Sequence, residues 1–204
     1  VEFYVTNQEY DYEIDAVTGE ITEKDMEIEN DFGSQATSDA SVSIEEAKKI
    51  VAYTYTAWDW DLGGLVWCEQ GLTDQATEQE LERGLSANAC CILVNAWLYQ
   101  LTGEKSYLEW ADRFYQFCKQ MQDPVTKIYY NGVHTLLQNS HRQAGDVNKD
   151  LYSYNSGSMI LADLLLFDIT KDSSYEQDAW QAAHATHEAF LQKNSNGTRE
   201  YKDF

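Results

Sequence analysis

Apolar side chains recur at steps of three and four residues through residues 85–121, on both sides of the pair Thr102-Gly103. This spacing is typical of two α-helices that each bury one face. Gly103 suits the left-handed conformation that ends a helix, and Ser106 with Glu109 has the spacing of a capping box that starts the next one. We therefore predict a helical hairpin. The buried stripe of its second helix consists of Tyr107, Trp110, Ala111, Phe114, Phe117, Cys118 and Met121.

The stretch at residues 98–111 is echoed by residues 166–179, at an offset of 68. Two helices per unit with a recurring sequence are typical of stacked hairpins in solenoids and α/α toroids. The alternative is that two independent turns use the same common capping residues. The repeat predicts a second hairpin at 154–193 that packs on the first. The recurring residues are Thr102 and Thr170, Ser106 and Ser174, Tyr107 and Tyr175, and Ala111 and Ala179.

Residues 3–22 alternate strand-forming and polar residues and contain a turn signal at Thr18-Gly19. A period of two with a glycine turn predicts a small antiparallel β meander. Residues 1–32 are intensely acidic, with eleven acidic side chains, one lysine and a net charge of -10. The small polar residues at 33–41 have the composition of a flexible linker. Ser43 and Glu46 then form a capping box for a helix that reaches about Ala57.

The composition excludes several classes of protein. The 204 residues include 35 acidic and 14 basic side chains, and the formal charge of -21 repels nucleic acid and anionic lipid, so we expect no nucleic-acid partner. No run approaches the roughly 18 apolar residues that a membrane span requires. The four cysteines have no metal-finger spacing and imply no disulfide framework. We expect buried free thiols, with a single bridge in an oxidising compartment as the alternative.

Candidate functional side chains are most concentrated at residues 58–67, which read WDWDLGGLVW. Aromatic faces stack on the C–H surfaces of sugars, and carboxylates accept hydrogen bonds from sugar hydroxyls. The two glycines allow the backbone to approach a neighbour closely. We predict a sugar-binding loop; the alternative is that two tryptophans belong to the core and the aspartates cap the next element. The predicted binding residues are Trp58, Asp59, Trp60, Asp61, Gly63, Gly64 and Trp67.

The second half of the chain contains fewer candidate functional residues. Residues 127–133 predict a short hairpin arm that turns at Asn131-Gly132, and residues 135–151 predict a long polar loop. The four histidines do not form a metal-binding set, because His134 and His141 share a loop, and His184 and His187 lie on a helix without an acidic or thiol partner. Phosphate-loop, dinucleotide-binding and serine-nucleophile motifs are absent. We predict no metal site and no cofactor.

The stretch YDYEIDAVTGEI, residues 10–21, resembles the signature of PepSY domains, small secreted modules of protease propeptides and cell-envelope proteins. Residues 43–51 resemble the start of the helix in such a module and equally suit the start of the next domain. The resemblance implies a PepSY-like β segment at 1–32, the linker at 33–41, a helical domain at 42–194 and a tail at 195–204. A role in protease regulation is one function that it would support.

A second resemblance covers about residues 44–193. The order and spacing of seven elements resemble the second half of glycoside hydrolase family 76, which contains secreted endo-α-1,6-mannanases with an (α/α)6 toroid fold. It implies a mainly α fold, a partial (α/α)6-like toroid of stacked hairpins after the β meander, a mannan-type polysaccharide as substrate or ligand, and a secreted or cell-envelope location. It also adds Tyr154 and Asn155, with Asn88, to the predicted binding residues. The matching elements are Trp58-Asp59, Gly63-Gly64, Trp67, Asn88, residues 98–111, Asn131-Gly132 and residues 154–157.

The chain also departs from the family pattern. Members are expected to carry two adjacent aspartates, nucleophile and acid/base, and no two aspartates are adjacent here. About five predicted helices stand against the twelve that close a toroid. The catalytic residues stay unassigned, with Asp59 and Asp61 as candidates, because a pair at i and i+2 in a loop can meet the carboxyl separation of about 5–5.5 Å or about 6.5–9.5 Å that glycosidases need.

Two functions therefore remain open. The first is a carbohydrate-active protein that resembles an α-1,6-mannan-degrading glycoside hydrolase and lacks the family's catalytic aspartate pair in this span. The second is a non-catalytic extracellular or envelope scaffold, in which the open face of a shortened toroid drives formation of a homo-oligomer.

Overall fold

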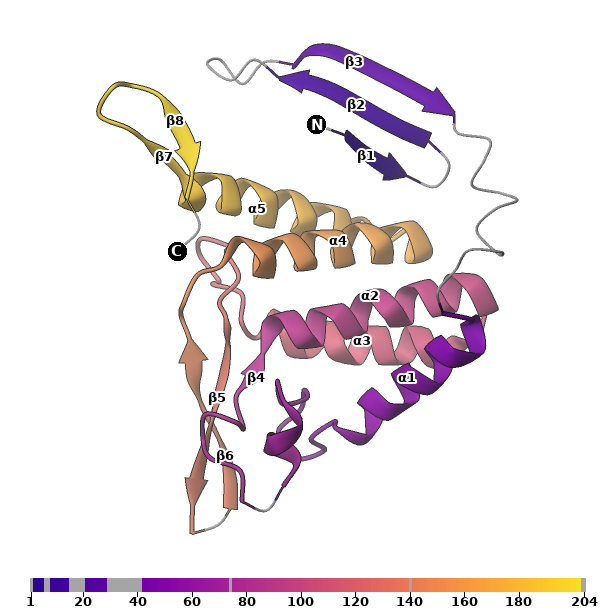
Figure 1. Cartoon of the computed structure of the whole chain (residues 1–204), viewed down its shortest axis with the longest axis vertical. Coiled ribbons are helices and arrows are strands. Elements are labelled where there is room, and N and C mark those ends of the chain that lie inside the picture. The colour runs from indigo at the N-terminus through magenta and orange to yellow at the C-terminus, as the bar shows by residue number, and fades with distance from the viewer. Residues whose placement is uncertain are drawn as a thin grey trace. The chain divides into compact units, whose positions relative to one another are not determined.

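The protein is mainly helical, with small antiparallel sheets (Figure 1). The computed structural model describes residues 2–5, 8–14, 21–28, 42–73, 75–139 and 141–202. Within these residues the helices are α1 (Ile44–Thr56), α2 (Leu85–Thr102), α3 (Lys105–Lys119), α4 (Ser153–Thr170) and α5 (Ser173–Phe190), with a short 3-10 helix η2 (Glu69–Leu72). The strands are β1 (Glu2–Val5), β2 (Gln8–Ile14), β3 (Ile21–Ile28), β4 (Arg83–Gly84), β5 (Gly132–Gln138), β6 (His141–Asn148), β7 (Leu191–Lys193) and β8 (Arg199–Tyr201).

The chain divides into two compact units, one of residues 1–43 with 193–200 and one of residues 44–192 with 201–204. In the first unit, β1, β2 and β3 form an antiparallel meander in which Phe3 pairs with Tyr10 and Tyr10 with Met26. This arrangement confirms the predicted meander, although β3 extends further than expected. The predicted turn at Thr18-Gly19 and the linker at 33–41 lie outside the described residues, and the PepSY-like character of the segment stays a prediction.

Two helical hairpins, α2–α3 and α4–α5, form the body of the second unit, and α2 packs against α4 (Figure 1). Both α2 and α4 contain 18 residues, and their bounds differ by the offset of 68 seen in the sequence. The turns after them match as well. The amide of Gly103 donates to the carbonyl of Tyr99 at 2.7 Å, and that of Lys171 donates to Phe167 at 2.8 Å. The repeat predicted from the sequence is confirmed at the level of individual hydrogen bonds.

The start of α3 differs from the prediction. The helix begins at Lys105 with Glu104 as N-cap, so Ser106 lies inside the first turn and is not the cap. In the second hairpin Asp172 is the N-cap, and its carboxylate accepts from the Ser174 amide at 2.9 Å. The predicted cap position was wrong because each helix begins directly after the left-handed residue and its successor, two residues before the position that the serine would require.

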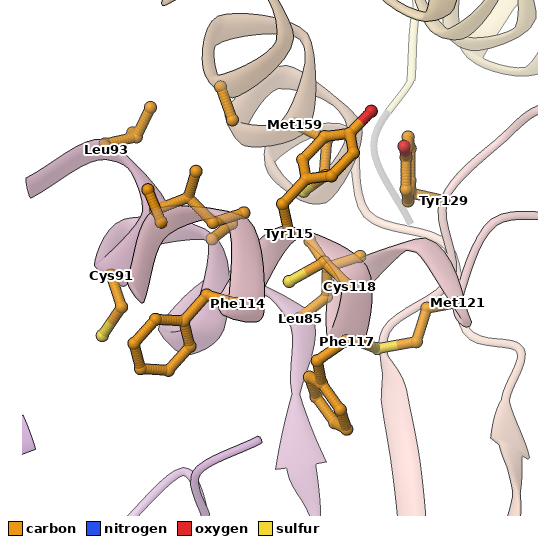
Figure 2. Packing of buried hydrophobic residues seen from close by; sticks show 14 of the residues in the cluster. Leu85, Cys91, Leu93, Phe114, Tyr115, Phe117, Cys118, Met121, Tyr129 and Met159 are labelled. Carbon is orange, nitrogen blue, oxygen red and sulfur yellow. The ribbon is translucent and has the colours of Figure 1, made fainter. Parts of the chain in front are cut away.

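The core lies where α2, α3 and α4 meet (Figure 2). The predicted stripe on α3 is confirmed: Ala111, Phe114, Cys118 and Met121 are fully buried, and Trp110 is partly covered. A smaller cluster joins α1 to this body through Val51, Leu98 and Tyr107. All four cysteines are free thiols, with Cys91 and Cys118 buried and Cys90 exposed.

Residues 132–148 contradict two predictions. They form the antiparallel hairpin β5–β6, and β4 pairs with the other edge of β5. The region is therefore no long loop, and Gly132 begins β5, so Asn131-Gly132 does not turn a hairpin. The sequence showed no period of two because β6 is mostly exposed on both faces, so neither face selects apolar residues. The predicted tail at 195–204 contains β8, which pairs with β7. Among the described helices, none is long and apolar enough to cross a membrane.

Candidate functional site

The loop at residues 58–65 closes on itself. Trp58 and Leu65 form an isolated bridge, and the amides of Asp59 and Gly63 donate to the carbonyls of Gly64 and Asp59 at 2.9 and 2.8 Å. The Asp59 carboxylate accepts from the amides of Asp61 and Leu62, both at 2.9 Å. Asp59 thus caps the turn of its own loop and not the next element, as the alternative had it, and one of its two carboxylate oxygens is occupied by backbone.

The two glycines of the loop allow a close approach to Phe117 on α3. Both adopt left-handed φ angles, 76° at Gly63 and 73° at Gly64. A Cβ atom on Gly64 would lie 2.5 Å from ring carbons of Phe117, a distance that real contacts do not allow. Their role in this structure is to seat the loop against the core.

Two buried side chains of the following segment clamp the same loop. Asn88 donates to the carbonyls of Leu65 and Gly84 at 3.1 and 2.8 Å and accepts from the Leu65 amide at 2.9 Å. Arg83 donates to the carbonyls of Leu62 and Gly63 at 2.8 and 2.9 Å. Burial lowers the pKa of the Arg83 guanidinium, and the negative charge of Asp59 opposes that shift. Asn88 is fully buried, so it supports the loop from beneath.

The three tryptophans of the predicted site occupy different environments. Trp58 packs edge-on against Phe114 and Phe117 in the core. Trp60 lies on the surface with 72% of its area exposed, and Asp61 beside it is exposed as well. Trp67 is 56% exposed, and its indole N–H donates to the carbonyl of Gln79 at 3.0 Å. The predicted single site is thus divided between the core, one surface and a pocket.

Trp67 lines a polar pocket of about 270 Å³ beside the N-terminus of α2. Figure 1 shows that α2 and α4 both begin on the side of the β4–β5–β6 sheet. An indole, a carboxylate and an amide therefore face one cavity, which is the combination that binds sugar rings and their hydroxyls. The lining residues are Trp67, Gln79, Glu82, Gly84, Ser86 and Asn131. A second, apolar pocket of about 210 Å³ lies between α1 and η2 and shares Trp67 with the first.

Glu82 lines the polar pocket, and its carboxylate accepts two side-chain hydrogen bonds there. Its Oε1 accepts from the amide groups of Asn148 at 3.0 Å and Asn131 at 3.4 Å, and its Oε2 lies 3.4 Å from Nδ1 of His134. The Glu82 side chain is only 17% exposed, whereas that of His134 is 48% exposed. Bonds from both strands of the hairpin thus hold the carboxylate in one orientation at the edge of the cavity.

Of the two predicted residues on α4, Asn155 contacts the hydrogen-bond network of Glu82 through Asn131. Asn155 is fully buried and donates to the side-chain oxygen of Asn131 at 3.2 Å. Tyr154 is 51% exposed and stacks on Tyr152, with ring centroids 5.3 Å apart. Asn155 therefore orients the side chain of Asn131 from a buried position. Tyr154 is a surface aromatic residue at the start of α4.

The family model of glycosyl hydrolase family 76 matches residues 23–202. This chain belongs to glycoside hydrolase family 76. No curated protein matches it.

Solved structures of family 76 proteins agree with the fold. A family 76 glycoside hydrolase from a bovine strain of Bacteroides thetaiotaomicron has 28% sequence identity and a TM-score of 0.63, over 78% of this chain and 34% of that one. A family 76 mannosidase from another B. thetaiotaomicron strain has 25% identity and a TM-score of 0.63, over 78% and 42% of the two chains. An α-1,6-mannanase variant of Salegentibacter sp. has 22% identity and a TM-score of 0.57, over 69% and 39%. The chain spans less than half the length of these relatives.

Sequence reasoning missed the pocket's carboxylate. Glu82 directly precedes β4, but its partners were predicted in a turn and a loop: Asn131 lies just before β5, and Asn148 ends β6. Asn131 itself belonged to the family 76 resemblance and was the available signal. Among the described residues, no three His, Cys, Asp or Glu side chains are grouped to hold a metal ion.

Proposed function

We propose that this chain is a mannan-directed part of a family 76 glycoside hydrolase and that the Trp67–Glu82–Asn131 pocket binds a mannose unit. The observation that carries the proposal is the pocket itself, because a family 76 chain here presents one exposed indole, one fixed carboxylate and one fixed amide to the same cavity. The Salegentibacter relative binds α-1,6-mannotriose in a variant in which two aspartates are replaced.

The fold supports the proposal in a second way. The two hairpins repeat with one offset and pack through α2 and α4, as successive units of an (α/α)6 toroid would. We infer that they form a section of such a toroid, and a secreted or cell-envelope location would suit a mannan-directed protein with a PepSY-like segment.

Binding of α-1,6-mannotetraose, measured by isothermal titration calorimetry, tests the site. Trp67→Ala and Glu82→Gln should each weaken the affinity at least about tenfold, because they remove the stacking surface and the charged hydroxyl acceptor. Trp67→Phe keeps a ring and should lose less. Trp180→Ala is the matched control, since Trp180 is 72% exposed on α5. If both pocket variants melt like the wild type and bind equally well, the pocket is wrongly assigned.

A non-catalytic role is the second candidate, and one observation favours it. No two aspartates are adjacent in the sequence, and Asp59 directs one carboxylate oxygen to the backbone of its own loop. In that role the same pocket captures mannan without cleaving it, and self-association would extend the scaffold. Release of reducing ends from α-1,6-mannan by the purified chain would exclude the scaffold; binding without release would support it.

A further inference from the structure

A second aromatic surface lies along α3, around the side chain of Arg113. Its guanidinium carbon is 4.5 Å from the ring centroid of Trp110, 5.0 Å from that of Trp60 and 6.0 Å from that of Trp58. Trp60 and Trp110 meet at 65° with centroids 6.0 Å apart. Three indoles from two segments of the chain thus surround one cation, and Arg113 and Trp60 are both exposed.

Arg113 is held differently from the described cations that form ion pairs. Within residues 42–202 as described, no carboxylate pairs with its guanidinium and no hydrogen bond engages it, so the indole faces alone hold it in place. A cation over an indole face is stabilised by the ring quadrupole and keeps its N–H donors for another partner. Four other described cations have carboxylate partners instead: Lys48 pairs with Glu104, Lys119 with Asp178, Arg142 with Asp59 and Lys171 with Asp168.

We propose that Trp60 and Arg113 form a second binding surface for neutral hexose units of a polysaccharide, an inference that rests on the proposed mannan-directed function. The exposed indole of Trp60 offers a face for the C–H side of a pyranose ring, and Arg113 donates to its hydroxyls. An anionic sugar is disfavoured, because exposed acidic side chains adjoin these residues in the sequence: Asp61 follows Trp60, and Asp112 precedes Arg113.

This surface is separate from the pocket. Neither Trp60 nor Arg113 lines either cavity, and neither belongs to the residues that resemble the family pattern. A short oligosaccharide that fills the pocket would not depend on Trp60, whereas a polymer can engage both sites at once. Linked binding events raise the overall affinity well above that of either site alone.

The test compares one oligosaccharide with one polymer. Affinities of the wild type and of Trp60→Ala, Arg113→Gln and Trp67→Ala are measured for α-1,6-mannotetraose and for linear α-1,6-mannan. We expect Trp60→Ala to weaken binding of the polymer about fivefold to tenfold and to leave tetraose binding unchanged. Arg113→Gln should act in the same direction with a smaller loss. Trp67→Ala should weaken both ligands.

The controls separate this inference from the proposed function. Trp180→Ala removes an equally exposed indole from α5, where no described ring or cation contacts it, and should change neither affinity. If Trp60→Ala binds the polymer like the wild type, or if Trp180→Ala loses as much, the second surface is wrong while the pocket stands. If Trp67→Ala binds both ligands normally, the pocket is wrong. Binding of neither ligand by the wild type overturns both.

Discussion

The two hairpins of the second unit have first helices of equal length and the same turn, yet they bury different polar groups. In both turns a threonine hydroxyl donates to the carbonyl four residues earlier at 2.7 Å, from Thr102 in one and Thr170 in the other. The residue after it is left-handed in each, with φ of 71° and 59°. A local pattern of few residues is therefore sufficient to fix the hairpin, whatever packs around it.

The equivalent buried positions at the offset of 68 are Asn95 on α2 and Asp163 on α4, both fully buried. Asn95 is satisfied, because it donates to the Cys91 carbonyl at 2.8 Å and accepts from the hydroxyl of Tyr55 on α1. One oxygen of Asp163 accepts from Tyr115 at 2.6 Å, and the other has no partner among the described residues. The neighbouring helix, which differs between the two hairpins, thus decides whether the same position holds an amide or an acid.

Placing the acid in the first hairpin should give the largest effect. Asn95→Asp removes the donor to Cys91 and introduces a carboxylate that none of the described cations is placed to compensate. We expect a loss of about 3–5 kcal/mol at pH 8, read from urea unfolding followed by circular dichroism. Asn95→Ala is the control for the lost hydrogen bonds alone. A variant at least as stable as the alanine control would show that the position tolerates a charge.

The reverse exchange should depend on pH. Burial, reinforced by the charge of Asp178, raises the pKa of Asp163 to about 7, while the Tyr115 hydroxyl and the Lys119 ammonium oppose the shift. Because the unfolded value is about 3.9, the folded state holds the extra proton between those pH values. The wild type therefore loses up to about 2–4 kcal/mol from this group as the pH rises through that window.

Asp163→Asn removes this titration. Its stability relative to the wild type should rise by about 2–4 kcal/mol between pH 4.5 and pH 8, measured by urea unfolding at each pH. Groups that titrate in both proteins cancel in the difference. A difference that stays constant across the range would mean that Asp163 keeps an ordinary pKa in the folded protein.

The sequence was sufficient for the hairpins, their offset and the stripe on α3, because caps and helical period are local properties. It was insufficient for the β5–β6 hairpin, where strands exposed on both faces show no alternation. It was also insufficient for the pocket. Glu82, Asn131 and Asn148 meet only when three strands pair, and that pairing was not predicted.

The prediction of a single sugar-binding site at residues 58–67 was also incomplete, because it depended on side-chain directions. Residues 58–67 form one dense stretch of aromatic and acidic residues, which suggested one site. In three dimensions Trp58 faces the core, Trp60 faces Arg113 and Trp67 faces the pocket. The direction of each tryptophan side chain depends on the turn that Asp59 stabilises and on the close approach of Gly63 and Gly64 to Phe117. The residue types alone do not specify these directions.

The side chains on α2 and α4 that accept hydrogen bonds from the backbone of other segments give a third comparison. Asn88 and Ser156 occupy equivalent positions, and both accept from a backbone amide: Asn88 from Leu65 at 2.9 Å and Ser156 from Tyr129 at 3.4 Å. Asn88 makes three bonds in all, so Asn88→Ala should cost about 2–3 kcal/mol, because three buried backbone groups lose their partners. Ser156→Ala should cost less than about 1 kcal/mol, since its single bond is long. Thermal unfolding ranks the two, and equal losses would contradict the comparison.

The smallest effect concerns the left-handed residue itself, which is Gly103 in one turn and Lys171 in the other. Gly103→Ala should cost about 1 kcal/mol, and this cost is purely conformational because an added Cβ meets no atom within 4 Å. Lys171→Gly should instead gain about 0.5–1 kcal/mol. The ion pair of Lys171 with Asp168 is largely exposed and contributes little. Lys171→Ala removes that pair and keeps the strained angle, so it should change the stability by less than about 0.5 kcal/mol. If Lys171→Gly is the less stable of the two Lys171 variants, the left-handed conformation is not what limits the second turn, and the two hairpins differ there for another reason.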